Sequence, residues 1–184
     1  MTIALLVIDC QMEFARRTAA GIPRSNPEAE TQIAQVIARF RARSLPVVHV
    51  HHDDPNPKSG FRLETPGGVV MPCAAPLAGE PIFVKHGSSG FIGTGLEDHL
   101  HKAEISRLVV VGAAVNFCVA STVRMAANLG FDVVLISDAV FGFGVTGPDK
   151  VSHDPNVVLS VTLGTLAGFA QVVPLSVERN TPPL

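Results

Sequence analysis

Cys118 occupies a position in the chain where a buried strand is expected to end and a helix to begin. It follows the stretch LVVVGAAVNF, in which an apolar run ends at Gly112, and the residues after Cys118 have a helical pattern. The first turn of a helix has N–H groups without intrahelical partners and a partial positive charge, so it favours a thiolate. The same N–H groups could hold an oxyanion. A cysteine placed here could therefore act as a nucleophile.

Two further side chains could activate this nucleophile. Asp9 follows the apolar run IALLVI, and Lys85 ends the run PIFVK. Ligands of open parallel sheets bind beyond the carboxyl ends of the strands, so Asp9, Lys85 and Cys118 are expected at one edge of a sheet. An aspartate could accept the thiol proton, and a lysine could favour the thiolate. Each has an ordinary alternative: a small buried hydrophobe for Cys118, a turn cap for Asp9 and a solvated strand end for Lys85.

The elements that must position these residues alternate along the chain. Apolar, β-branched runs predict strands covered on both faces; they lie at 3–8, 46–51, 81–85, 108–112, 132–137 and 170–174. Helical patterns separate them, one with Ser25 and Glu28 at the spacing of a capping box. The alternation predicts one α/β domain over residues 1–184, with three layers and a six-stranded, mainly parallel sheet. The long Pro- and Gly-rich stretch 53–80 is expected to be a functional loop.

The strand order decides whether Lys85 can meet Asp9. In the order 3-2-1-4-5-6 the first and third strands are not neighbours. Lys85 must then cross two spacings of about 4.8 Å each. Either the chain bends inward after the third strand or the strand order is different.

Composition excludes several classes of partner. The chain has 184 residues, 47% hydrophobic and 16% charged, with a net charge of −2 and no basic stripe, so neither nucleic acid nor a membrane is expected as a partner. The first apolar run meets Asp9 after a few residues, which predicts neither a signal peptide nor a membrane span. Three cysteines without paired spacing are typical of a cytoplasmic protein and argue against disulfides or a zinc site.

Three blocks of the sequence together resemble the isochorismatase-like cysteine hydrolases, a group that includes nicotinamidases and N-carbamoylsarcosine amidohydrolase. The blocks, in chain order, are LLVIDCQMEF, VKHGSSGFIGTGLEDHL and VVVGAAVNFCVASTVRMAANLGFDVVLISDA. The resemblance implies that Asp9, Lys85 and Cys118 form a catalytic triad. It also implies a cis peptide bond between Ala113 and Ala114, and an oxyanion hole made by the N–H groups of Ala114 and Cys118.

The resemblance further implies hydrolysis of a small amide-type C–N bond, or of an ester, through a thioester on Cys118. We expect no cofactor, a small-molecule substrate and a homo-oligomer, either a dimer or a tetramer. Cys118 should be more reactive than Cys10 or Cys73. Residues expected to line the substrate pocket are Gln11, Phe14, His52, Phe91 and Phe141.

Departures from the family pattern leave alternatives open. Val115 stands where the family usually has Thr, and Met125 where it often has an acid, so we expect differences in the substrate and in the hydrogen bonds near the triad. An isochorismatase-type vinyl ether hydrolase would not need the cysteine, and a non-catalytic oligomeric member would need no triad. Cys118 and Arg124 also match the C-x5-R spacing of thiol phosphatases, but the β-branched residues between them favour a helix, and Arg124 is expected in a structural or subunit contact.

A histidine-rich segment, His49–Asp54, raises the question of a metal. Nicotinamidases have an Asp-x-His plus a further His after the second strand, but Pro55 stands where one histidine is needed. We therefore expect no bound metal, and His52 or Asp53 in the pocket wall instead.

Overall fold

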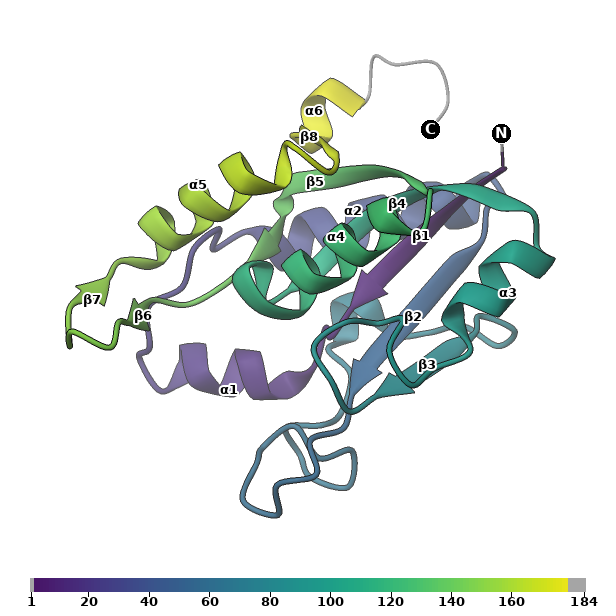
Figure 1. Cartoon of the computed structure of the whole chain (residues 1–184). Helices are drawn as coiled ribbons and strands as arrows, with labels where there is room; N and C mark the ends of the chain where they lie inside the picture. Colours follow the sequence, from purple (N-terminus) through teal and green to yellow (C-terminus); the bar gives the residue numbers. More distant parts are fainter. Residues whose placement is uncertain (1, 179–184) are drawn as a thin grey trace.

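The computed structural model describes residues 2–178 and contains a central six-stranded sheet in the order β3-β2-β1-β4-β5-β8 (Figure 1). Every neighbouring pair in this sheet is parallel. Its strands are β1 (Thr2–Ile8), β2 (Val47–His52), β3 (Ile82–Lys85), β4 (Ile105–Ala113), β5 (Asp132–Phe141) and β8 (Gln171–Val173). A separate antiparallel hairpin consists of β6 (Val145–Thr146) and β7 (Ser152–His153).

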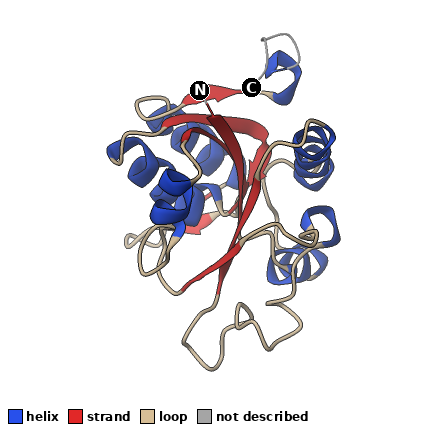
Figure 2. Cartoon of the chain, turned by 90° about the vertical axis from the view of Figure 1, so that its right-hand side faces the viewer, coloured by secondary structure: helices blue, strands red, loops and turns tan. Residues whose placement is uncertain are grey.

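Helices cover both faces of the sheet (Figure 2). The core on one face includes residues of α1 (Met12–Ala19), α2 (Ala29–Ala42) and α6 (Leu175–Glu178). The core on the other face includes residues of α3 (Leu96–Lys102), α4 (Ala120–Asn128) and α5 (Pro155–Leu166). The predicted three-layer α/β fold with a six-stranded parallel sheet is therefore confirmed. No helix within residues 2–178 is long and apolar enough to span a membrane.

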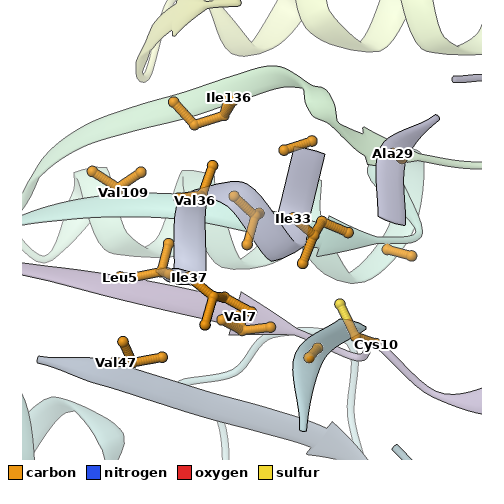
Figure 3. Close-up of a cluster of buried hydrophobic side chains, with 14 of the residues drawn as sticks. Leu5, Val7, Cys10, Ala29, Ile33, Val36, Ile37, Val47, Val109 and Ile136 are labelled. Atoms are coloured by element: carbon orange, nitrogen blue, oxygen red, sulfur yellow. The ribbon is translucent and has the colours of Figure 1, made fainter. Parts of the chain in front are cut away.

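Strand β1 shows why the strands read as unbroken apolar runs. Leu5 and Val7 point into the α2 side, and Leu6 and Ile8 into the opposite core, so both faces are buried. Figure 3 shows the α2 side, where Ile33, Val36 and Ile37 pack onto Leu5, Val7 and Val109. Full burial of an aliphatic side chain of this size contributes roughly 1.5–3 kcal/mol relative to exposure.

Gly112 allows β4 to approach β1 closely just before the predicted nucleophile. It pairs with Ile8, has a φ of 123°, and a Cβ there would lie 2.0 Å from the Ile8 carbonyl oxygen. Only glycine fits such a conformation and such an approach. The end of β4 thereby lies beside the end of β1, and Asp9 is the next residue after β1.

The start of α2 differs from the sequence prediction. Ser25 and Glu28 do not form a capping box, because the helix begins at Ala29 and Glu28 is itself the N-cap residue without a side-chain cap. The Ser25 hydroxyl instead bonds to the backbone N–H and carbonyl of Gly142, which follows β5. Residues 53–80 form the expected long connection, with one short 3₁₀ turn at Pro72–Ala74.

Candidate active site

Asp9 is the first residue after β1 and lies at the bottom of a cavity. Its backbone adopts a φ of 48°, unusual for a residue other than glycine, and its N–H donates to Val50 O at 2.8 Å. The side chain is almost fully buried. The next residue, Cys10, points into the α2-side core, as Figure 3 shows, so this thiol lies on the opposite side of the sheet.

Lys85 reaches Asp9 across β2. Its Nζ lies 2.8 Å from Asp9 Oδ2 and 3.3 Å from Cys118 Sγ, and it donates to Gly87 O at 3.1 Å. The sheet has the order β3-β2-β1-β4-β5-β8, so of the two alternatives left open the strand order is not different, and Lys85 reaches Asp9 across β2. The Lys85 ammonium and the Asp9 carboxylate are both buried. Removing either one would leave an unpaired buried charge, which strongly destabilises a folded protein.

Cys118 lies in a π-helical turn, Val115–Val119, that connects β4 to α4. The predicted cis peptide bond between Ala113 and Ala114 is present immediately before this turn. Ala114 and Cys118 both line the cavity.

Burial and charge keep the Cys118 thiol protonated. Burial and, after it, the negative charge of Asp9 raise the pKa of Cys118 to about 12, although Lys85 partly opposes both effects. Burial also raises the pKa of Cys73, to about 11, so acidity in the free protein gives Cys118 no advantage over Cys73. The expected greater reactivity of Cys118 remains a prediction. If Cys118 is the nucleophile, its thiol must therefore lose its proton after a substrate has bound.

Asp9 is suited to accept that proton. Burial raises the pKa of the Asp9 carboxyl, and the ion pair with Lys85 opposes this rise. Asp9 Oδ2 faces Lys85, whereas Oδ1 is buried and accepts no hydrogen bond of standard geometry from the described residues. A carboxylate with a raised pKa is a better general base near neutral pH than an ordinary aspartate.

The cavity above these residues has a volume of about 670 Å³. The predicted residues Phe14 and His52 line it, and His52 Nδ1 lies 3.4 Å from Lys85 Nζ. One wall is aromatic: the Phe14 ring is 4.7 Å from Phe61 and 6.0 Å from Phe143, measured between centroids. The cavity can therefore receive a small molecule with an apolar body and a polar reacting group.

Of the five residues predicted to line the substrate pocket, Phe91, Phe141 and Gln11 do not line the cavity. Phe91 is buried on the α3/α4 side of the sheet, where its ring stacks on Phe131, because the chain has left the strand edge by this point. Phe141 is still within β5 and packs beneath Phe14 in the α2-side core. Asp53 also lies outside the wall, and the neighbouring Asp54 lines it instead.

Gln11, the third, is fully buried and supports the site from behind. Its Nε2 donates to His52 O at 2.8 Å and to Gly68 O at 3.2 Å, and its Oε1 accepts from His52 N at 2.9 Å. The amide thus fixes the end of β2 and the 53–80 loop to the end of β1. It holds the backbone of His52 rather than a substrate.

Several residues of the cavity wall were not predicted: most come from loops without a periodic pattern, whereas Arg17 lies in α1 and Asn116 and Phe117 in the π-helical turn. They are Arg17, Asp54, Ser59, Phe61, His86, Gly87, Ser88, Asn116, Phe117 and the segment 143–146. Phe61 belongs to the loop that the sequence marked as functional. The Oδ1 atom of Asn116 is buried without a hydrogen-bond partner among the described residues, a feature that only the folded structure reveals.

The histidine-rich segment does not gather into a metal site. His49 Nε2 pairs with Glu80 Oε2 at 2.8 Å, whereas His52 faces Lys85. Residues 2–178 contain no group of three or more His, Cys, Asp or Glu side chains arranged to hold a metal ion.

We predict that dialysis against a chelator leaves turnover unchanged, because the site has its own base and nucleophile. The measurement is activity before and after chelation, with elemental analysis of the purified protein. One equivalent of zinc or iron, together with activity lost on chelation and restored by the metal, would contradict this prediction.

Arg124 does not support a phosphatase site. Its guanidinium lies 5.6 Å from the Phe169 ring centroid, and Nη2 donates to Thr165 at 3.3 Å. It therefore connects α4 to α5 and the residues after it, and it is not among the residues that line the cavity around Cys118.

Comparison with known proteins identifies the family. The isochorismatase domain profile matches residues 3–154. The chain is 33% identical over 163 residues to the uncharacterized isochorismatase family protein YrdC of Bacillus subtilis, covering 89% of this chain and 86% of YrdC. It is 30% identical over 188 residues to a streptothricin hydrolase of Streptomyces noursei, covering 98% and 66% of the two chains.

A crystal structure described as a hydrolase of the isochorismatase family, from Chromobacterium violaceum, matches with a TM-score of 0.90 and 36% identity over 95% of this chain and 90% of that one. The residues matched by the family profile, 3–154, include Asp9, Lys85 and Cys118. The chain belongs to the isochorismatase family of hydrolases.

Proposed function

We propose that this hydrolase cleaves a small amide-type C–N bond through a thioester on Cys118. The observation that carries the proposal is the position of Lys85 Nζ, within 3.3 Å of the Cys118 sulfur and 2.8 Å of the Asp9 carboxylate, at the bottom of the cavity. A nucleophile, a base and a cation are thus in contact where a substrate can reach them.

The first half of the proposed reaction forms the thioester. Asp9 takes the proton from the Cys118 thiol as the sulfur attacks the substrate carbonyl carbon. The carbonyl oxygen becomes an oxyanion, which the N–H groups of Ala114 and Cys118 stabilise. When the C–N bond breaks, Asp9 returns the proton to the leaving amine.

The second half releases the acid. A water molecule takes the place of the amine and loses a proton to Asp9 as it attacks the thioester carbonyl. The C–S bond then breaks, and the Cys118 thiolate takes back the proton, which restores the starting state. Lys85 remains charged throughout, orients Asp9 and stabilises the thiolate while it exists.

The protonated resting thiol is consistent with this sequence of steps. A thiolate beside Asp9 would place two negative charges together in a buried site. Keeping the proton on sulfur until the carbonyl is in place avoids this arrangement, and the negative charge then moves to the substrate oxygen rather than remaining on the enzyme.

Two alternatives remain distinct from this proposal. A vinyl ether hydrolase could use the same cavity without the thiol, and a non-catalytic oligomeric protein would use neither. The buried Asp9–Lys85 pair beside an accessible thiol favours the cysteine hydrolase. We also propose a homo-oligomer, because α5 has no charged side chain and exposes Val157 and Val161.

A turnover screen tests the proposal. Small amides, carbamoyl compounds, nicotinamide, small esters and a vinyl ether are incubated with the wild-type protein and with Cys118→Ala, and the released amine, ammonia, alcohol or carbonyl product is measured. We expect at least one C–N substrate to be hydrolysed by the wild type alone. Equal turnover by Cys118→Ala would reject the cysteine mechanism, and turnover of a vinyl ether alone would favour the isochorismatase-type reaction.

A further inference from the structure

We propose that Arg17 selects amides that carry a carboxylate at the end remote from the scissile bond. The inference rests on the proposed function for the identity of the bond that is cleaved. It concerns a different part of the cavity, the rim formed by α1 and the 53–80 loop.

Arg17 is held in place on two sides. Its Nε donates to Glu13 Oε1 at 3.1 Å, one helical turn earlier, and its guanidinium carbon lies 5.1 Å from the centroid of the Phe61 ring. Glu13 is itself fixed against the loop: a Cβ at Gly60 would lie 2.2 Å from its Oε2. A guanidinium stacked on a ring and bonded through Nε loses little further freedom when it binds a ligand.

The remaining donors of Arg17 are free to bind a ligand. No acceptor among the described residues bonds to Nη1 or Nη2, and Arg17 is part of the cavity wall. Arg16 lies 3.6 Å from the same Glu13 carboxylate, so two guanidinium groups share one negative charge. Arg16, Arg17 and Glu13 together therefore give the rim a net charge of +1. The planar Arg17 guanidinium also has the geometry to donate two parallel hydrogen bonds to a carboxylate.

The aromatic part of the cavity wall determines which kind of group can connect the carboxylate of the substrate to its scissile amide. Phe14 lies three residues before Arg17 on the same helical face, and the rings of Phe61 and Phe143 extend the apolar surface from it. Because these rings line the same cavity as Cys118 and Arg17, a ligand that contacts both residues also meets an apolar surface. The substrate class is thus a monoamide of a dicarboxylic acid with an apolar spacer.

Asp54 is the charged residue of the wall that could oppose this selection. Its carboxylate accepts from the N–H of Asn56 at 3.0 Å, so it closes a turn of its own loop. If Asp54 rather than Arg17 determined the preference, the favoured substrates would carry an ammonium group in place of the carboxylate. The test therefore includes such amides.

The probes are the monoamides of succinic, glutaric and terephthalic acid. Each is compared with a neutral counterpart, in which an acetyl group replaces the carboxylate, and with a cationic counterpart that carries an aminomethyl group. Both kcat/KM for the wild type and affinity for Cys118→Ala, by calorimetry, are measured. We expect at least one acid to be preferred over its neutral counterpart by about tenfold or more, which is the usual strength of a charge-assisted contact.

Arg17→Met should abolish this preference by raising KM for the acid, with kcat and the thermal unfolding midpoint nearly unchanged. Arg17→Lys should restore part of it, and Arg16→Met, which removes the neighbouring partner of Glu13, should keep it. A preference that survives in Arg17→Met, or the absence of any preference for the acids, would overturn the proposal. Full turnover by Cys118→Ala would instead reject the proposed function, and the calorimetric comparison would still test Arg17.

Discussion

Asp9→Asn is expected to abolish turnover and, in the same protein, to make Cys118 more reactive toward iodoacetamide. Loss of the general base should lower kcat by about 100- to 10,000-fold. The charge of Asp9 raises the pKa of the Cys118 thiol, so its removal should lower that pKa and increase the thiolate fraction. Catalysis and thiol reactivity should therefore change in opposite directions.

The measurement is the labelling rate of Cys118 as a function of pH, by peptide mass spectrometry, beside kcat for the same variant. Asp54→Asn is the matched control, because it removes a carboxylate of the same cavity that closes a loop turn. It should change neither quantity strongly. If labelling of Cys118 slows together with turnover in Asp9→Asn, the role of Asp9 as proton acceptor is wrong.

Lys85→Met should cause the largest loss of stability together with loss of turnover. The substitution leaves the Asp9 carboxylate buried without its cation, which costs about 3–5 kcal/mol in comparable buried pairs. Because Lys85 lowers the pKa of Cys118, its loss should also slow labelling, the reverse of the Asp9→Asn result. Urea unfolding and labelling rates measure the two effects.

The double variant Asp9→Asn/Lys85→Met provides the control for stability. It removes both charges, so it should be more stable than Lys85→Met alone while remaining inactive. If Lys85→Met unfolds at the wild-type urea concentration, or if the double variant is the less stable of the two, the ion pair does not have the energetic role assigned to it here.

The layered fold could be predicted because its signals are local. Buried parallel strands such as β1 are apolar on both faces, and this leaves an unmistakable run in the sequence. The start of α2 was misplaced because Ser25 has a better partner than its own helix, the backbone of Gly142, more than a hundred residues away in the chain. A capping pattern cannot show such a competitor.

The catalytic cluster was predictable from topology and from the family resemblance, but the pocket wall was not. Asp9, Lys85 and Cys118 each end or follow a strand, and strand ends meet at one edge. Phe91 and Phe141 have the right residue type but lie in the two cores, because the side a loop or strand residue faces depends on the path of the chain.

The acidity of Cys118 could not be predicted from the sequence alone. A helix start and a lysine both favour a thiolate, whereas burial and the adjacent Asp9 oppose it, and the weight of each effect depends on distances that only the fold sets. The raised pKa of the Cys118 thiol is consistent with the proposed transfer of its proton to Asp9 during attack.

The most direct test of this account is to trap the acyl-enzyme. A substrate found in the screen is turned over in the presence of hydroxylamine, and acid-quenched samples are analysed by peptide mass spectrometry. We predict an acyl group on Cys118 and formation of the corresponding hydroxamate, both absent in Cys118→Ala. Hydrolysis that continues after Cys118 has been fully alkylated, with no adduct on Cys118 and no hydroxamate, would contradict the cysteine-hydrolase mechanism.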